Sequence, residues 1–189
     1  MLKCTRVPNS SSLAEVTLRP GREADAPVLL RLMDDRTEWL VNQGRTKQWG
    51  TQRQSDKPER VQQATKLATS GGTWLAVEED PTGSQHEQVL GAITVTDVAA
   101  SYVSPATEPE LYINYFITDP KKGGGRGLGD MLIDKAKALA NEKGVRLLRL
   151  DCYAGGDNKL VRWYESRGFQ KQEAFEVKGW SGQVLMMRL

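Results

Sequence analysis

A chain of 189 residues, 39% hydrophobic and 26% charged, has the size and composition of one soluble globular domain. The formal net charge is only +2, and acidic and basic residues are interspersed, which argues against the basic stripe of a nucleic-acid binder. One histidine, His86, and two scattered cysteines, Cys4 and Cys152, argue against a zinc site or a disulfide framework.

The apolar runs and the N-terminal stretch bear on location. No apolar run approaches the length of a membrane span, and MLKCTRVPNSSSLAEV lacks the apolar centre of a signal peptide. We therefore expect a cytoplasmic protein with reduced thiols and no membrane partner. Residues 1–15 are polar and serine-rich, so we expect a flexible tail there, followed by a single domain over residues 16–189.

The first part of the chain predicts a strand, two helices and three strands. Apolar residues recur at helical spacing over two segments, residues 23–43 and 55–70, which Gly44 and Gly71 end. The stretch between them, RTKQWGTQRQ, is a predicted loop. The predicted strands, rich in β-branched and aromatic residues, cover 16–20, 73–79, 88–99 and 110–119.

The second part alternates helices and strands. The predicted elements are, in order, a helix over 128–143, a strand over 145–153, a helix over 157–167 and strands over 169–179 and 183–189. Asp157 or Asn158 is the candidate N-cap of the second helix, and the stretch GWSG is the predicted turn between the last two strands. This order of elements indicates a mixed α/β (α+β) domain.

Five glycines occupy the seven positions 123–129, between a strand that ends ITDP and the next predicted helix. The first turn of a helix carries unpaired N–H groups and the positive end of the helix dipole, and glycines let the backbone approach an anion closely. Lys121, Lys122 and Arg126 add positive charge at the same place. The pattern favours a phosphate-binding loop, although a flexible strand-to-helix turn has a similar composition.

Two common phosphate-binding loops do not fit this segment well. A Walker A loop needs GK[ST] after its glycines, and this sequence reads GRGLGD. The dinucleotide fingerprint GxGxxG is met by Gly123 and Gly125 only when Leu128 replaces the last glycine. The segment also lies two-thirds of the way down the chain, whereas that fingerprint belongs to an early βαβ unit.

The segment GGRGLGDMLI resembles the acetyl-CoA pyrophosphate loop of the GNAT superfamily of N-acetyltransferases, whose pattern is Q/R-x-x-G-x-G/A at the start of a helix. Gly127 and Gly129 match the last two positions, and Gly124 stands at the Q/R position. Further along, VRWYESRGF (161–169) resembles the second signature of the family, a helix that reads xxxYExxGF.

The order of predicted elements is also similar to the family fold, and the resemblance covers about residues 16–189. The loop between Pro120 and Gly127 is one residue longer than usual. Asp157, followed by Asn158, stands where the family has an asparagine. The resemblance implies a mixed, mostly antiparallel central sheet of about seven strands flanked by about four helices.

The resemblance further implies an acetyl-CoA-dependent N-acetyltransferase that moves the acetyl group directly to a primary amine of a small molecule or peptide in a ternary complex. The glycine loop would hold the pyrophosphate, and the backbone of the strand before it would hydrogen-bond the pantetheine arm. The cofactor-binding residues expected on this basis are Phe116, Ile117, Thr118, Lys122, Gly123, Gly124, Gly125, Arg126, Gly127, Leu128, Gly129, Asp130 and Asn158.

Direct transfer requires a proton for the departing thiolate and the loss of a proton from the amine. Tyr164 occupies the frequent general-acid position of the family, and a phenol with a pKa near 10 is a suitable donor to a thiolate. Glu110 is the candidate general base, and Asp151 is an alternative. Cys152 is expected to be inert core rather than an acyl carrier.

The acceptor pocket implied by the resemblance lies among the first helices, their loop and the last hairpin. Its candidate lining residues are Trp39, Trp49, Tyr112, Asn114 and Trp180, with Tyr112 and Asn114 on one face of their strand by alternation. We expect a small-molecule amine as partner, no nucleic acid and no metal, and a homodimer is left open. The competing interpretations are a non-catalytic acyl-CoA-binding sensor and a nucleotide- or nucleic-acid-binding domain.

Overall fold

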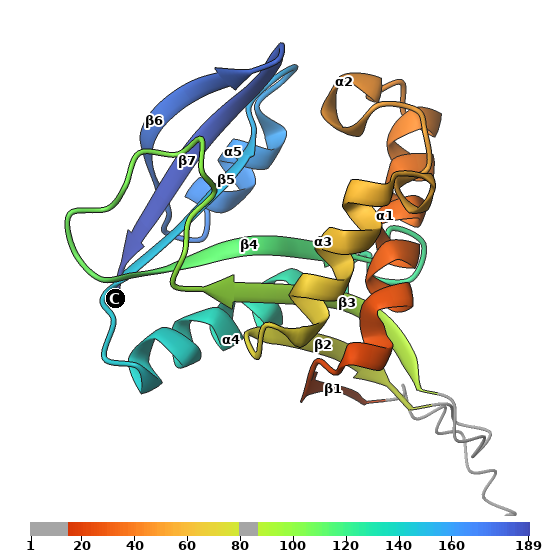
Figure 1. Ribbon diagram of the computed structural model, residues 1–189, viewed down its shortest axis with the longest axis horizontal. Helices are drawn as coiled ribbons and strands as arrows, with labels where there is room; N and C mark the ends of the chain where they lie inside the picture. Colours follow the sequence, from red (N-terminus) through yellow and green to blue (C-terminus); the bar gives the residue numbers. More distant parts are fainter. Residues whose placement is uncertain (1–14, 80–86) are drawn as a thin grey trace, which may run out of the picture.

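The computed structural model describes residues 15–79 and 87–189. It contains a seven-stranded sheet in the order β1-β2-β3-β4-β5-β7-β6, with helices on both faces (Figure 1). All neighbouring strands are antiparallel except β4 and β5. The strands are β1 (Val16–Pro20), β2 (Thr73–Glu78), β3 (Gln88–Thr96), β4 (Glu110–Thr118), β5 (Leu147–Tyr153), β6 (Gln170–Val177) and β7 (Trp180–Arg188).

The helices are α1 (Ala26–Asn42), α2 (Thr46–Trp49), α3 (Pro58–Thr69), α4 (Leu128–Glu142) and α5 (Lys159–Glu165), with short 3-10 turns η1 (Glu23–Asp25) and η2 (Gln54–Asp56). The predicted fold class and the mostly antiparallel seven-stranded sheet are thus confirmed. Within the described ranges, no helix has the length and apolar character needed to cross a membrane. Cys4, His86 and all but the last residue of the expected tail lie outside the described residues.

Two local predictions were wrong. The stretch predicted as a loop between the first two helices contains α2, a single helical turn. The turn between the last two strands is Lys178 and Gly179, not GWSG, and β7 already begins at Trp180. Both turn residues have positive φ, 51° and 78°, which is the backbone of a tight two-residue hairpin.

The sheet buries a different apolar cluster on each face. On one face, α1 and α3 pack on β2, β3 and the second half of β4, for example through Leu29 and Leu67. On the other, α4 and α5 pack on the middle of the sheet through residues such as Leu132 and Val161. None of the described helices covers β5 and β7 on the α1 side. There the connection between β3 and β4 crosses the sheet, and Val103 packs beside Tyr112 and Val184 (Figure 1).

A β-bulge in β4 changes which face its side chains meet. Thr94 pairs with Tyr115 but Val95 pairs with Ile113, so Asn114 is an extra residue in β4. Residues two positions apart in a regular strand point to the same face of the sheet. Here Ile113 lies in the α4-side cluster and Tyr115 in the α1-side cluster. The bulge shifts the alternation only beyond Asn114, whose side chain bonds Thr96, the cross-strand partner of Tyr112.

Candidate active site

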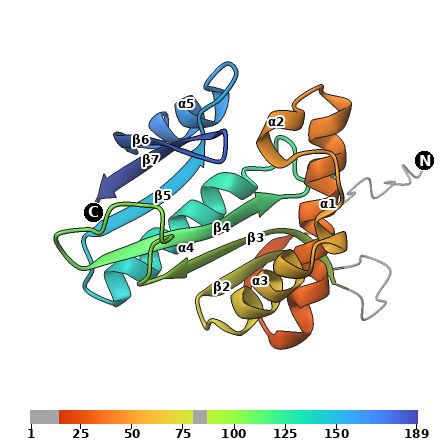
Figure 2. The same ribbon diagram turned by 45° about the horizontal axis from the view of Figure 1, so that its top comes forward.

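The two parallel strands in the centre of the sheet separate before they end. β4 and β5 pair only from Glu110 with Leu147 to Ile113 with Leu150. From Tyr115 to Thr118, β4 is paired on its β3 side alone, and the bulge residue Asn114 is paired on neither side. A cavity of about 1250 Å³ opens where the two strands part, and it extends from the glycine loop to α2 and the β6–β7 turn. Figure 2 shows α2 across this opening from the β6–β7 hairpin.

The glycine loop starts from one buried residue at the end of β4, Asp119. The carboxylate of Asp119 accepts hydrogen bonds from the backbone N–H groups of Lys121 (2.8 Å) and Lys122 (3.0 Å). The backbone carbonyl of Asp119 accepts one from the N–H of Gly123 (2.9 Å). Asp119 is only 4% exposed. These three bonds turn the chain sharply away from the sheet and direct the following glycines toward the cavity.

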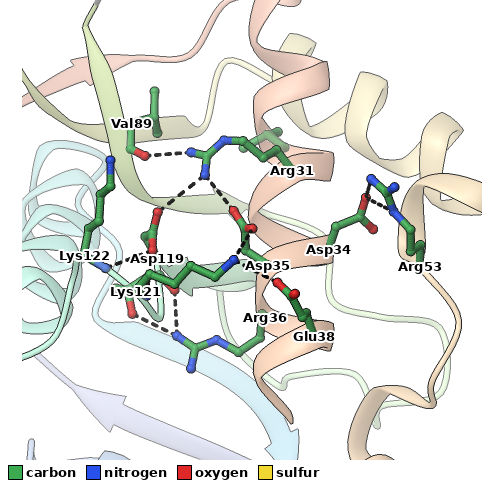
Figure 3. A network of polar contacts seen from close by, with 12 residues as sticks. Arg31, Asp34, Asp35, Arg36, Glu38, Arg53, Val89, Asp119, Lys121 and Lys122 are labelled. Carbon is green, nitrogen blue, oxygen red and sulfur yellow. Dashed lines mark hydrogen bonds and ion pairs between the residues drawn. The ribbon is translucent and has the colours of Figure 1, made fainter. Parts of the chain in front are cut away.

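Charged residues of α1 tie this helix to the same loop (Figure 3). Arg31 contacts the carboxylate of Asp119 at 3.4 Å and donates to the carbonyl of Val89 at 2.8 Å. Arg36 donates to the carbonyl of Thr118 at 2.6 Å. Burial lowers the pKa of Arg36, which also lines the cavity. The wall formed by α1 is therefore fixed relative to the end of β4.

The five glycines of the loop differ in their surroundings and in their backbone conformation. A Cβ on Gly123 would lie 2.7 Å from the Asp119 carbonyl, and a Cβ on Gly129 would lie 2.7 Å from the Trp163 ring. Gly125 and Gly127 have φ of +72° and +69°, which L side chains rarely adopt. Gly124, Gly125 and Gly127 have open space where a Cβ would be. The loop thus combines two close contacts with an open, side-chain-free surface.

Helix α4 begins in this loop without a side-chain cap. Its N-cap is Gly127, and the first helical hydrogen bond runs from the N–H of Met131 to the Gly127 carbonyl at 3.0 Å. Among the described residues, no acceptor is present for the N–H groups of Leu128, Gly129 and Asp130. Such a helix start, lying at the cavity, presents donors and a positive dipole end to an anion.

Tyr164 of α5 lies in an aromatic cluster at the cavity. Its ring contacts those of Phe116 (6.1 Å between centroids), Trp163 (5.0 Å) and Phe169 (5.6 Å), and the residue is 5% exposed. Burial raises the pKa of Tyr164 well above its usual value, so the phenol is protonated at neutral pH. Within the described chain, its hydroxyl has no hydrogen-bond partner, which leaves it available to a ligand in the cavity.

Asp151 of β5 lies at the point where the strands part. Its Oδ1 accepts the hydroxyl of Tyr112 at 2.6 Å, and its Oδ2 accepts the hydroxyl of Tyr102 at 3.2 Å. Burial raises the pKa of the Asp151 carboxyl, while the two phenols oppose the rise. Asp151 lines the cavity, so a partly desolvated carboxylate is positioned beside the free part of β4.

Glu110 and Cys152 have surroundings that differ from those of Asp151. The carboxylate of Glu110 is bound by the fully buried Arg149 at 3.1 Å, and Glu110 does not line the cavity. Burial raises the pKa of Cys152 to about 12, so its thiol is a weak nucleophile at neutral pH. In the part of the chain that is described, no cluster of His, Cys, Asp or Glu is arranged to hold a metal ion.

The structure brings together most, but not all, of the expected cofactor residues. The residues at the cavity are Phe116, Ile117, Thr118, Gly123, Gly125, Gly127, Leu128, Gly129 and Asp130. Lys122, Gly124 and Arg126 belong to the loop but do not line the cavity, and Arg126 is paired with Glu78 at 2.6 Å. Asn158 also lies off the cavity and caps α5 without a side-chain hydrogen bond.

The expected acceptor residues divide in the same way. Trp39, Trp49, Asn114 and Trp180 line the cavity, whereas Tyr112 lies beneath it and reaches it only through Asp151. Sequence reasoning missed Arg36, Tyr102 and Phe175. An aromatic residue in a polar loop is a weak signal for Tyr102, and nothing in the sequence distinguishes Arg36 from other helix-surface arginines.

Two contacts close the cavity on the side of α2. The indole N–H of Trp180 donates to the carbonyl of Gln48 at 2.9 Å, and Arg45 pairs with Asp157 at 2.9 Å. They join α2 and the residue before it to the β6–β7 hairpin and to the start of α5. The cavity consequently has two ends, one at the glycine loop and one beneath this bridge.

A family model identifies the family of the chain, and solved structures show its fold. The model of the Acetyltransferase (GNAT) family matches residues 32–169, well over half of the chain. The match includes both the glycine loop and the helix that carries Tyr164. No curated protein sequence matches the chain.

Solved structures show the same fold at low sequence identity. A GNAT-family acetyltransferase from Listeria monocytogenes 4b F2365 is 20% identical, with a TM-score of 0.66 over 95% of this chain and 98% of that chain. The NatC complex bound to Gag peptide and CoA matches with 14% identity, a TM-score of 0.64 and coverage of 93% and 99%. Ribosomal-protein-alanine N-acetyltransferase from Brucella melitensis matches with 20% identity, a TM-score of 0.59 and coverage of 92% and 99%.

Proposed function

Because the chain belongs to the GNAT acetyltransferase family and is an acyltransferase, we propose that it transfers the acetyl group of acetyl-CoA directly to a primary amine. The observation that carries the proposal is the arrangement of one cavity. The free edge of β4, the uncapped start of α4 and the Tyr164 hydroxyl all lie on it. A fold that binds acyl-CoA thus has its donors and its proton source in one place.

The residues present fit acetyl-CoA on physical grounds. The N–H groups of Leu128, Gly129 and Asp130 are suited to the pyrophosphate, since they have no acceptor among the described residues. The open surface at Gly125 and Gly127 leaves room for it. The β4 backbone from Asn114 to Thr118 would pair with the amides of the pantetheine arm. When bound, acetyl-CoA supplies an activated thioester.

Tyr164 is proposed as the general acid. Its buried, protonated phenol would donate to the sulfur as the carbon–sulfur bond breaks. The raised pKa does not prevent this role, because the proton moves only as negative charge develops on sulfur. The neighbouring rings of Phe116 and Trp163 hold the Tyr164 ring in place.

Asp151 is proposed as the general base in place of Glu110. Glu110 is bound to Arg149 and lies off the cavity, whereas Asp151 lines it and has no cation partner among the described residues. Asp151 would take one proton from the ammonium form of the amine, which then attacks. The nitrogen gives up its second proton as the amide forms, and that proton restores Tyr164. Asp151 then releases the first proton to solvent, so charges and atoms balance.

The competing interpretation is a protein that binds acyl-CoA without catalysis. Such a protein needs the glycine loop and β4, but it does not need a largely buried carboxylate where β4 and β5 part. The presence of Asp151 on the cavity therefore favours an enzyme. A cytoplasmic location completes the proposal, in keeping with Cys152, which is a free thiol.

Isothermal titration with acetyl-CoA, with ATP and NAD as controls, tests the cofactor, and release of free thiol in the presence of amines tests the reaction. We expect selective one-to-one binding of acetyl-CoA and amine-dependent thiol release. Absence of acetyl-CoA binding would contradict the proposal. Binding without thiol release for a broad amine panel would support the non-catalytic alternative.

A further inference from the structure

The cavity holds a carboxylate that lacks a counter-ion. Among the residues that the structure describes, two acidic ones line it, Asp130 and Asp151. Asp130 is paired with Arg167 at 2.6 Å. Asp151 accepts two phenol hydroxyls and forms no ion pair with any described residue. A largely buried carboxylate in this state is stabilised by an incoming cation, and the ammonium group of the acceptor supplies one.

An aromatic wall leads away from this carboxylate. Tyr102 contacts Phe175 (5.1 Å between ring centroids), Phe175 contacts Trp180 (5.9 Å), and Trp180 contacts Tyr153 (5.7 Å). All four residues line the cavity. Tyr102 touches both the wall and Asp151, so an apolar or aromatic body attached to the amine would lie against these rings.

Basic side chains surround the same end of the cavity. Lys47 of α2, Arg60 of α3 and Lys178 of the β6–β7 turn line it, and none of them forms an ion pair within the described residues. Arg45, in contrast, is neutralised by Asp157. Burial and the neighbouring Asp151 raise the pKa of Tyr102 to about 12, and the Arg60 charge opposes this rise.

Resting on the proposed function, we infer that the acceptor is an amino acid: an amine that also carries a carboxylate, on an apolar or aromatic body. Its ammonium group pairs with Asp151, its side chain packs on the aromatic wall, and its carboxylate meets Arg60, Lys47 and Lys178. Lys47, Arg60 and Lys178 are exposed, so an amine without an anionic group forgoes only their screened attraction, whereas one with a second cation would be repelled.

The same cations could instead serve the phosphates of acetyl-CoA, and their position argues against it. They come from α2, the first turn of α3 and the β6–β7 turn. The uncapped helix start and open glycines that suit a pyrophosphate belong to the loop before α4.

Matched acceptors test the inference with the full-length protein and acetyl-CoA. Thiol release is measured for L-phenylalanine, its amide and 2-phenylethylamine, and for L-tryptophan and tryptamine. We expect kcat/KM to be at least about 10-fold higher for each amino acid than for its amide or decarboxylated partner, as for a charge-assisted contact of about 1.4 kcal/mol. A ratio near or below one in all three comparisons would overturn the inference.

Variants identify the groups responsible. In Arg60→Gln and in Lys178→Gln we expect the amino-acid preference to fall toward one, while Lys66→Gln, an exposed lysine of α3 off the cavity, keeps it. A preference that persists in the Arg60→Gln, Lys178→Gln double variant would contradict the assignment. The assignment would also be contradicted if titration showed a loss of acetyl-CoA affinity large enough to explain the whole change in kcat/KM.

The two levels of proposal fail differently. Absence of both acetyl-CoA binding and thiol release contradicts the proposed function itself. Thiol release with simple amines but not with apolar or aromatic amino acids leaves the transferase intact and overturns only the acceptor class. If acetyl-CoA binds but none of these amino acids causes thiol release, the proposed acceptor class is also overturned.

Discussion

Oδ1 of Asp151 lies 2.6 Å from the hydroxyl of Tyr112, and this contact holds a partly desolvated carboxylate where β4 and β5 part. Tyr112 itself is fully buried and points at the cavity only through this bond. The two residues belong to neighbouring strands, 39 positions apart in the chain. The phenol orients the carboxylate and leaves it without a cation, which is the state a general base needs.

Replacing Asp151 by Asn should lower kcat/KM about 100-fold, since general-base catalysis contributes on the order of 10² to 10⁴. Burial raises the pKa of Asp151, so wild-type kcat/KM should fall as the pH drops through that raised pKa. The variant should lose this acidic limb. A pH profile of thiol release measures both effects, and Asp134→Asn, an exposed carboxylate of α4, is the control. An unchanged profile would exclude Asp151 as the base.

The same substitution has a predicted effect on stability. The folded pKa of Asp151 is raised above its ordinary value of 3.8, so between these two values the folded state binds more protons than the unfolded state. The free energy of unfolding therefore falls as pH rises through this window. Asp151→Asn removes that cost, and its stability relative to wild type should increase from pH 4 to pH 7. Urea unfolding at both pH values measures it; a constant difference would show that the carboxyl pKa is not raised.

Tyr164→Phe should reduce kcat about 100-fold or more while the Kd of acetyl-CoA stays within about 2-fold, because only the proton donor is lost. The matched control is Tyr115→Phe. Its hydroxyl is bound to the Leu29 carbonyl at 3.0 Å, and its loss should cost about 1 kcal/mol of stability without a comparable loss of kcat. Titration, steady-state kinetics and thermal unfolding separate the two. Full activity of Tyr164→Phe would remove the acid role.

Gly127→Ala should weaken acetyl-CoA binding about 10-fold and destabilise the fold by about 1–2 kcal/mol, because its φ of +69° is unfavourable for a residue with a Cβ. Gly144→Ala is the matched control. Gly144 has a φ of +67° and also has open space around a Cβ, but it ends α4 away from the loop. It should show the same loss of stability with unchanged affinity. Equal affinities for both variants would contradict the role of the loop.

Asp25→Asn should destabilise the protein by about 2 kcal/mol. Asp25 is 6% exposed and accepts two bonds from Arg19 at 2.8 Å and the N–H of Arg22 at 2.7 Å. The hydrogen bonds from Arg19 hold the pKa of Asp25 below 3.8, so this stability is present above pH 3.8 and is lost as pH falls through the lowered value.

Urea unfolding at pH 7 and pH 3 checks the Asp25 prediction. The difference between wild type and Asp25→Asn should shrink at the lower pH. Glu108→Gln breaks an exposed ion pair with Arg188 and should change the free energy of unfolding by less than about 0.5 kcal/mol. An Asp25→Asn variant as stable as Glu108→Gln would show that the buried pair contributes little.

Most of the fold was predictable because its elements are strongly patterned. The apolar spacing in α1 and α3 and the β-branched runs of β3 and β4 mark their type and order. The helix α2 was not predictable, since TKQW is a single turn without a repeating pattern. The bulge at Asn114 also leaves no trace in a strand of nine residues that otherwise reads as regular.

The candidate site divides in a similar way. The glycine loop and Tyr164 are encoded in short local motifs, so the sequence indicates them. Short sequence motifs do not decide whether Glu110 or Asp151 is the better candidate for the general base. Both lie near strand ends, and only the tertiary structure shows that Arg149 occupies the first and that the second lines the cavity. The aromatic wall likewise depends on a loop that crosses the sheet to meet Phe175.

The parting of β4 and β5 places an unpaired strand edge inside the sheet instead of at its border. Exposed edges invite pairing with other chains, and proteins usually shield them with charge, bulges or short length. Here β3 and β5 flank the unpaired edge and helices pack on both faces of the sheet, so the edge does not lie at the border. The gap thus leaves backbone N–H and C=O groups of β4 unpaired inside the sheet, and their partner in our proposal is a single extended arm that carries amide groups.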